Sequence, residues 1–178
     1  MSDSARRSPA PEPPAADLAG AVRRCRSRGE FLAALRRLYE EVDRRLAGGA
    51  KCLGGGGCCK FDLAGHRLYL TAGELALLAD SPPPPPRGGP APEGGSIRSK
   101  APDKPLRELR CPYQHRGRCS AYPRRPLGCR VYFCRAAARG GPPAAYEEFH
   151  RKLIELHERF ALPYLYVELT AALRQVLR

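Results

Sequence analysis

The sequence predicts a mainly helical protein in which a small helical domain surrounds an irregular, cysteine-rich metal-binding core. Two observations support this fold class: amphipathic segments near both ends of the chain, and a middle region whose cysteines lie among glycines and prolines. The length of 178 residues suits one domain, which we place at residues 17–178. Residues 1–16 hold few large apolar side chains, so we expect a disordered N-terminal tail.

Two helical segments are expected at the start of the domain. Ala21, Val22 and Cys25 share one helical face before Gly29 interrupts the pattern. Apolar residues then recur at steps of three and four, the period of an amphipathic helix, at Phe31, Leu35, Leu38, Val42 and Leu46. The glycines at 48–49 are expected to end this helix. Cys25 lies apart from the other seven cysteines, and we interpret it as a buried apolar residue.

A strand and another helix are expected next. Residues 66–70 alternate in polarity, as an extended strand does. Thr71 and Glu74 have the spacing of a capping box, in which each side chain bonds the backbone N–H of the other, so a helix should follow through Ala79. A tract rich in proline and glycine comes after it, and we expect a surface excursion over about residues 81–104.

The last third of the chain is expected to change from turns to helices. Prolines and glycines interrupt residues 111–134, which predicts turns with short helical pieces. A helix is expected from Tyr146 to about Ala161, with an apolar stripe at Phe149, Leu153, Leu156 and Phe160. Pro163 is expected in the first turn of a final helix. That helix would bury Leu165, Leu169, Leu173 and Val176.

The cellular compartment bears on the role of the eight cysteines. No stretch approaches the roughly 20 apolar residues of a membrane helix, and the N-terminus has no apolar signal segment. We therefore expect a cytoplasmic protein with no membrane partner. Thiols in that reducing compartment do not usually form disulfides, and at this density they usually bind metal. A disulfide or a thiol redox pair is the alternative.

The cysteine spacing supports metal binding without matching a common zinc motif. Two groups are separated by 51 residues, and neither contains a Cys-x2-Cys pair; they are Cys52, Cys58 and Cys59, followed by Cys111, Cys119, Cys129 and Cys134. Their neighbours are glycine, proline and arginine, whereas ordinary buried cysteines lie in apolar periodic segments. The glycines at 54–57 allow the tight bends that several thiolates need to reach one centre.

The segment from Cys52 to Cys134 resembles the YkgJ-type cysteine-cluster family, described as a zinc- or iron-chelating domain of bacterial type. The family has a Cys-x2-Cys-x2-Cys-Cys box, a Leu-Thr-x2-Glu helix start and a Cys-Pro-aromatic run. That run continues to a Cys-x2-Tyr-x2-Arg-Pro-x2-Cys-Arg segment. Residues 70–74, 111–113, 119–122 and 125–130 match the second and third elements nearly position by position.

The resemblance implies a ligand set, and the first box departs from the family pattern. Gly55 stands where the family has its second cysteine, and Cys134 is a local candidate to replace that ligand. The resemblance carries the ligand role to Cys52, Cys58, Cys59, Cys111, Cys119 and Cys129. With Cys134 these exceed one tetrahedral site, so we expect two metals, a polynuclear centre or some spectator thiols. Both an iron–sulfur cluster and zinc fit the donors.

Histidines and aromatic residues near the cysteines have secondary roles in this interpretation. His66 and His115 are alternate ligand candidates. His150 and His157 lie seven residues apart on one helical face, where we expect a polar flank or a contact at the core edge. The rings of Tyr113, Tyr122, Tyr132 and Phe133 are expected to cover the metal site and keep it dry.

The charge leaves two interpretations open. The chain has a formal net charge of +13, and residues 98–139 hold 12 Lys and Arg against two acidic residues. This stretch is either a cationic shell around an anionic thiolate centre or a nucleic-acid surface, and no nucleic-acid-binding motif favours the second. Its arginines are candidates to bond sulfur or an anion, against a solvated loop face; they are Arg110, Arg124, Arg125, Arg130 and Arg135.

These observations favour a metal-binding protein over an enzyme. We expect a Cys-ligated iron–sulfur or zinc centre that serves electron transfer, metal handling or a protein-modifying partner. One alternative is an enzyme that uses the centre in protein modification such as methyl transfer, for which no catalytic motif is present. The other is a zinc-stabilised nucleic-acid-binding module.

Overall fold

A computed structural model describes residues 17–46, 59–61, 67–80, 83, 110–131 and 143–177. Several expectations lie outside these residues: the N-terminal tail, the glycines at 48–49, the proline- and glycine-rich excursion except Pro83, and the side chains of Cys52, Cys58, His66, Tyr132, Phe133, Cys134 and Arg135. None of the described helices is long and apolar enough to cross a membrane.

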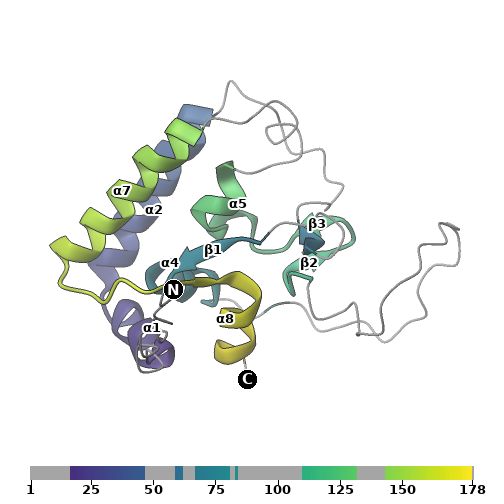
Figure 1. Ribbon diagram of the computed structural model, residues 1–178, viewed down its shortest axis with the longest axis horizontal. Coiled ribbons are helices and arrows are strands. Elements are labelled where there is room, and N and C mark those ends of the chain that lie inside the picture. The colour runs from purple at the N-terminus through teal and green to yellow at the C-terminus, as the bar shows by residue number, and fades with distance from the viewer. Residues whose placement is uncertain are drawn as a thin grey trace, which may run out of the picture.

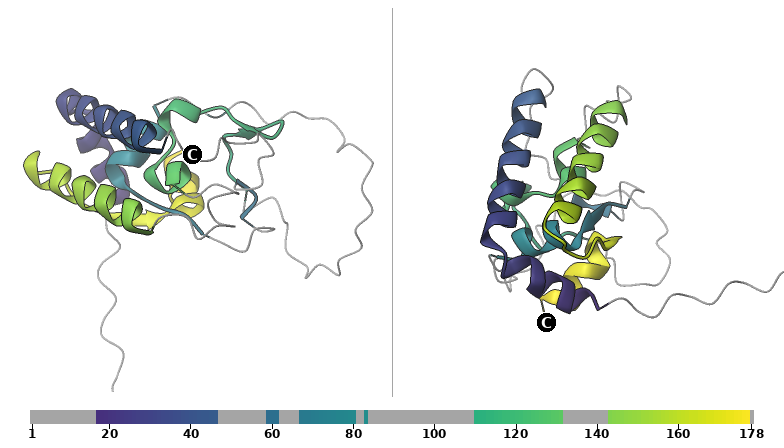
Figure 2. Two further views of the ribbon diagram at one scale, coloured as in Figure 1. Left: turned by 90° about the horizontal axis from the view of Figure 1, so that it is seen from above. Right: turned by 90° about the vertical axis from the view of Figure 1, so that its left-hand side faces the viewer.

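The described part is mainly helical, as the sequence predicts. Its helices are α1 (Leu18–Arg26), α2 (Gly29–Leu46), α4 (Ala72–Leu78), α5 (Leu127–Val131), α7 (Pro143–Arg159) and α8 (Leu169–Val176). Helices α2 and α7 run side by side in opposite directions, as Figures 1 and 2 show. Helix α4 packs against α1 and α2, and α5 packs against both α2 and α7.

Two small antiparallel sheets complete the fold. Strand β1 (Tyr69–Thr71) pairs with β4 (Tyr166–Glu168), which joins the middle of the chain to its end. Strands β2 (Gln114–His115) and β3 (Arg118–Cys119) form a hairpin, followed by a 3₁₀ turn, η3 (Tyr122–Arg124). The hairpin lies at the opposite side of the molecule from the α2–α7 pair (Figure 1).

The core is aliphatic and aromatic, and the expected helical stripes build it. Its most buried members come from α2, β1, α4, α7 and α8, and they include Phe31, Leu35, Leu70, Leu75, Leu77, Phe149, Leu153, Leu169 and Leu173. Cys25 is fully buried in this core, as predicted, and burial raises the pKa of its thiol to about 11. Cys111, Cys119 and Cys129 are half-buried and pack against the core edge. The described part of the core is therefore not built of cysteines.

Helix α4 is the central element, because every one of its seven residues is buried. A helix in this position cannot use water to satisfy the N–H groups of its first turn. The predicted capping box supplies protein acceptors: the Thr71 hydroxyl accepts from the Glu74 N–H, and the Glu74 carboxylate accepts from the Thr71 N–H at 2.8 Å. The sequence pattern is thereby confirmed at the atomic level.

The predicted start of the last helix is wrong. Pro163 lies in a segment with no helix or strand, and the final helix, α8, begins at Leu169. Strand β4 precedes this helix and pairs with β1, and the Leu165 carbonyl accepts from the Ala72 N–H at 2.9 Å. Glu168 caps α8 by accepting from the N–H groups of Thr170 and Ala171. Tertiary pairing therefore overrides the helical spacing of Leu165.

His157 is not a polar flank but a fully buried core residue. Its ring lies edge-on to Phe31, with centroids 5.1 Å apart, and to Tyr164 at 5.5 Å. Within the described part of the chain, neither ring nitrogen makes a well-formed hydrogen bond. Burial lowers the pKa of His157, so the ring is neutral near pH 7. His150 lies on the same face of α7, seven residues before His157, and is only half-buried, as expected for a contact at the core edge.

Gly73 allows α4 to approach this aromatic group closely. A Cβ at position 73 would lie 2.4 Å from Phe31 Cζ and 2.9 Å from His157 Nε2, both inside van der Waals contact. We predict that Gly73→Ala lowers the free energy of unfolding by about 1–3 kcal/mol through overpacking, measured by urea denaturation.

Gly29 at the start of α2 provides the matched control. A Cβ there meets no atom within 4 Å, so Gly29→Ala should leave stability unchanged or raise it by up to about 1 kcal/mol. Equal effects of the two substitutions would contradict the close packing at Gly73.

Candidate metal centre

The segment that carries Cys129 is attached to the core through the Glu74 carboxylate. Besides capping α4, this carboxylate accepts from the Tyr39 hydroxyl at 3.0 Å and from the Leu127 N–H at 2.7 Å. Leu127 is the first residue of α5, which contains Cys129. Burial raises the pKa of Glu74, and the hydrogen bonds from Leu127, Thr71 and Tyr39 oppose that shift.

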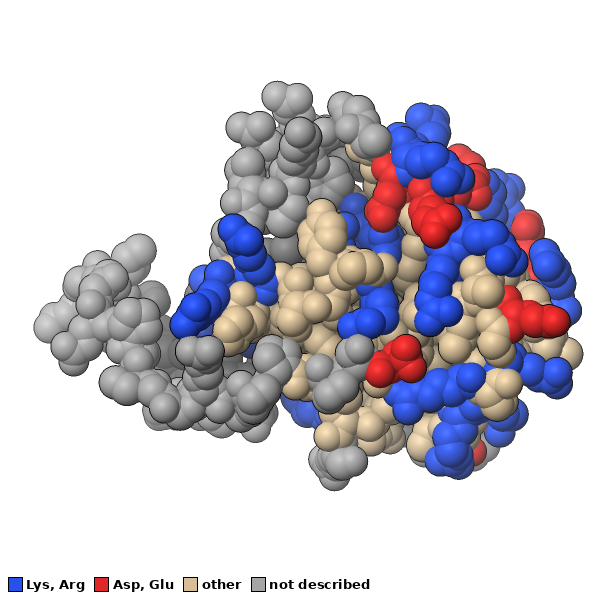
Figure 3. Space-filling view, turned by 180° about the vertical axis from the view of Figure 1, so that it is seen from behind, with Lys and Arg blue, Asp and Glu red and all other residues tan. Residues whose placement is uncertain are grey.

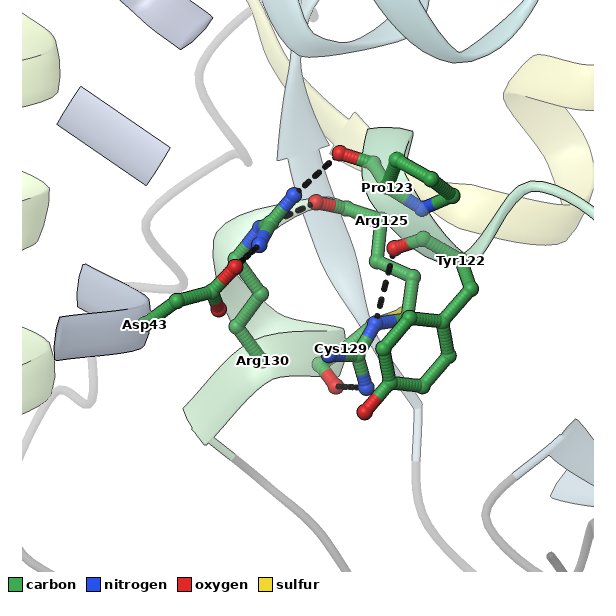
Figure 4. Close-up of polar contacts among 6 residues, drawn as sticks. All are labelled: Asp43, Tyr122, Pro123, Arg125, Cys129 and Arg130. Atoms are coloured by element: carbon green, nitrogen blue, oxygen red, sulfur yellow. Dashed lines mark hydrogen bonds and ion pairs between the residues drawn. The ribbon is translucent and has the colours of Figure 1, made fainter. Parts of the chain in front are cut away.

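Arg130, the residue after Cys129, makes a second attachment (Figure 4). Its buried guanidinium pairs with Asp43 at 2.5 Å and donates to the carbonyls of Pro123 at 2.6 Å and Arg125 at 2.8 Å. It also lies over the Tyr39 ring, 4.1 Å from the centroid. Arg130 therefore does not belong to a solvated loop face, and the anion that it bonds is the Asp43 carboxylate of its own chain. Its donors are used to hold η3 and α5 against α2.

Arg125 holds the same turn from the outside. It donates to the Tyr122 carbonyl at 3.1 Å and to the Cys129 carbonyl at 3.3 Å, and its guanidinium lies 3.6 Å from the Tyr122 ring centroid. Tyr122 lies on the solvent side of this turn, and 47% of the residue is exposed. Tyr122 therefore does not exclude water as we expected, and its ring is instead stacked on a cation.

The two cysteine groups meet at Cys59 and Cys111. The Cys111 N–H donates to the Cys59 carbonyl at 3.1 Å, and the next residues outward, Lys60 and Arg110, form an antiparallel bridge. Segments 51 residues apart in the chain are thus joined through their backbones. Both cysteines are half-buried.

The hairpin places Cys119 next to this junction. Cys119 lies opposite Gln114 in the β2–β3 ladder, and the Gln114 N–H donates to the Cys111 carbonyl at 3.0 Å. The two residues between the strands have positive φ angles, 49° at Arg116 and 77° at Gly117, as a tight two-residue hairpin turn requires. The sequence predicted turns with short helical pieces here, and the hairpin was missed because Arg-Gly is not among the residue pairs typical of such turns.

Tyr113, the residue before β2, is fully buried, while its predicted role of covering a metal site stays a prediction. Burial raises its pKa to about 12, and the negative charge of an ionised Cys111 adds to this shift, as Cys119 does to a smaller extent. The Tyr113 carbonyl accepts from both the N–H and the hydroxyl of Ser120, at 2.8 and 3.0 Å. One buried tyrosine therefore lies within electrostatic reach of both thiols.

The described residues bring together only part of the predicted ligand set. Three of the cysteines lie on joined segments, namely Cys59, Cys111 and Cys119. Cys129 lies on α5, where the charge of its thiolate is the last of the causes that raise the pKa of Tyr39. Over residues 17–46, 59–61, 67–80, 83, 110–131 and 143–177, no three Cys, His, Asp or Glu side chains converge to hold a metal ion. His115 is half-buried on β2, opposite Arg118.

Sequence reasoning missed the polar network that supports α5. Glu74 was recognised as a capping residue, but its bonds to Tyr39 and Leu127 join parts of the chain that no local pattern connects. Burial, and after it the Glu74 carboxylate, raise the pKa of Tyr39 well above its usual value, while Arg130 opposes this. An Arg within a basic stretch gave no signal that it would be buried.

On the face that Figure 3 shows, the basic side chains are not gathered into one patch. Figure 3 shows Lys and Arg side chains spread over the rear face of the molecule, with acidic side chains among them. Within the stretch 98–139, Arg125 and Arg130 bond carbonyls of their own chain. Those two side chains have their donors engaged inside the fold.

Comparisons with known proteins identified no relative of this chain. No protein-family model, curated protein or solved structure was found to match this chain. The functional argument therefore depends on the residues and their geometry.

Removal of the Arg130 guanidinium should disrupt the support of α5. We predict that Arg130→Met, which keeps the apolar stem, lowers the free energy of unfolding by about 3 kcal/mol, because the Pro123 and Arg125 carbonyls lose their donor. Asp43 is 54% exposed, so Asp43→Asn should cost about 1 kcal/mol or less. Chemical denaturation measures both, and an equal loss in the two variants would show that only the ion pair matters.

Proposed function

We propose that this chain is a cytoplasmic metal-binding protein with an iron–sulfur cluster or zinc held by cysteine thiolates. The ligands would come from Cys52, Cys58, Cys59, Cys111, Cys119, Cys129 and Cys134. Such a centre suits electron transfer, metal handling or assistance to a protein-modifying partner. The likeness to the YkgJ-type cysteine-cluster family is part of the proposal.

The observation that supports the proposal is the backbone junction between Cys59 and Cys111. This backbone contact brings one cysteine of each group together, as ligands of a shared centre must be. The pairing lies at the core edge, where half-buried thiols are reachable by a metal and shielded in part from water.

The donor chemistry fits a thiophilic metal. Thiolates are the preferred ligands of both structural zinc and iron–sulfur clusters. Cys59, Cys111 and Cys119 would act as ligands, while Tyr113 shields the site. Adjacent Cys58 and Cys59 do not easily bind one mononuclear ion, and this favours a polynuclear centre or different roles for the two thiols. A bound cluster would supply one-electron redox chemistry, and zinc would supply cross-linking of the two segments.

The basic stretch gives less support to the nucleic-acid-binding alternative. Arg125 and Arg130 use their donors on carbonyls of the chain, so these two are not presented to phosphates. The charge spread over the described rear face fits a general cationic surface (Figure 3).

Cysteine replacements test the proposal. We predict that the double substitution Cys58→Ser and Cys59→Ser lowers bound metal to less than about half of that in the parent protein, because two of the proposed thiolate ligands are lost. Metal per chain is measured by elemental analysis after anaerobic purification, and circular dichroism reports whether the helices form.

The control is Cys25→Ala, which removes a thiol from the apolar core. Alanine is used because a serine hydroxyl would be buried there without a partner, which makes Ser a poor control at this position. Metal content should be unchanged in this variant. If the double variant keeps the parent's metal content, the ligand assignment is wrong.

A further inference from the structure

A group of aromatic rings from β1, β4, α7 and the segment between α7 and β4 lies at the surface. It consists of Tyr69, Tyr146, His150, Tyr164 and Tyr166, and we call it the tyrosine patch. The rings of Tyr69 and Tyr166 are stacked, with centroids 5.5 Å apart and planes 26° apart. The His150 ring lies 5.1 Å from Tyr166 and 5.4 Å from Tyr146. The patch is therefore continuous from the β1–β4 ladder to α7.

Hydrogen bonds fix the rings in place. The Tyr146 and Tyr166 hydroxyls are bonded to each other, and His150 Nε2 is bonded to the Tyr164 hydroxyl at 2.7 Å. Beneath the patch, the Tyr164 ring rests on the buried His157. Ordered rings lose little conformational freedom when they bind a partner, which favours their use as a binding surface.

The exposure of the patch is unusual for this protein. Among the described residues, only three large apolar or aromatic side chains are strongly exposed, and two belong to the patch: Tyr69 at 43% and Tyr166 at 40%. The third, Tyr122, is stacked on Arg125. Grouped exposed aromatics indicate an interaction site, whereas isolated ones need no explanation.

The charge beside the patch points to a polyanion. Arg67 and Tyr69 are both exposed, while Leu68 and Leu70 are buried, so Arg67 and Tyr69 lie on the same side of this extended segment. Arg67 has no hydrogen bond or ion pair within the described part of the chain. The acidic residue opposite Tyr69 is Glu168, and its carboxylate accepts bonds at the start of α8.

We propose that the tyrosine patch binds unpaired bases of single-stranded nucleic acid, with Arg67 contacting the phosphate backbone. Nucleobases stack on tyrosine rings with little dependence on sequence, and the net charge of +13 attracts the backbone. Paired bases in a duplex cannot reach the rings, so the surface selects single strands. The proposed surface differs from the basic stretch 98–139, and it does not depend on the metal centre.

Fluorescence anisotropy with a labelled oligothymidylate of about 20 nucleotides tests this assignment on the full chain as purified. Tyr69→Ala and Tyr166→Ala should each weaken binding about 5- to 150-fold, since one stacked base is worth about 1–3 kcal/mol. Tyr69→Phe keeps the ring and should bind within twofold of the parent. The matched control is Tyr122→Ala, another exposed tyrosine outside the patch, which should also stay within twofold.

The salt dependence of binding distinguishes the contribution of Arg67 from that of the tyrosine rings. Arg67→Ala should reduce the slope of log affinity against log salt by about 0.7, the value for one phosphate contact on a single strand. Tyr69→Ala should leave this slope unchanged, because stacking releases no counterions.

Three results would overturn the proposal. One is Tyr69→Ala binding as tightly as Tyr122→Ala, which would make the attraction a general charge effect. Another is equal affinity for duplex and single strand. The third is no binding at about 100 mM salt, in which case the patch serves another kind of partner, such as an acidic protein. If Tyr166→Ala fails to fold in thermal unfolding, the comparison of Tyr69→Ala with Tyr69→Phe decides alone.

Discussion

One buried carboxylate, that of Glu74, is the constraint on which the described fold depends. Helix α4 is buried on all sides, so its first N–H groups need acceptors from the protein itself. Glu74 meets this need and also bonds Tyr39 on α2 and Leu127 at the start of α5. A single buried carboxyl group is thus shared by three helices, and its burial is tolerated because each bond replaces one to water.

The described cysteines are held in place in two different ways, and only one of them depends on Glu74. Cys129 is positioned through α5, which is held by Glu74 and by the contacts of Arg130 with η3 and α2 (Figure 4). Cys59, Cys111 and Cys119 are positioned by backbone pairing around the β2–β3 hairpin. A bound metal would link these two supports and would therefore stabilise the middle of the chain.

Local patterns predicted the elements whose causes are local. The stripe on α2, the capping box at Thr71 and the burial of Cys25 each depend on spacing or on a neighbouring residue, and each is confirmed. The start of α8 and the burial of Arg130 were missed because they depend on partners from distant parts of the chain.

In the candidate site too, the features with local causes were predicted and those that depend on distant partners were not. Spacing and context identified the cysteines as a group, whereas the Cys59–Cys111 junction is a tertiary contact that no local pattern contains. The tyrosine patch is a similar case. Tyr69 and Tyr146 are 77 positions apart in the sequence, and β4 brings their rings into one surface.

The most direct test of the central claim is the analysis of metal and acid-labile sulfide in anaerobically purified protein, together with its visible spectrum. We predict stoichiometric metal. Iron with sulfide and visible absorbance would identify a cluster, and zinc in colourless protein would identify a structural centre. Less than one tenth of a metal ion per chain, on the order of trace contamination, would contradict the claim that these cysteines form a metal centre.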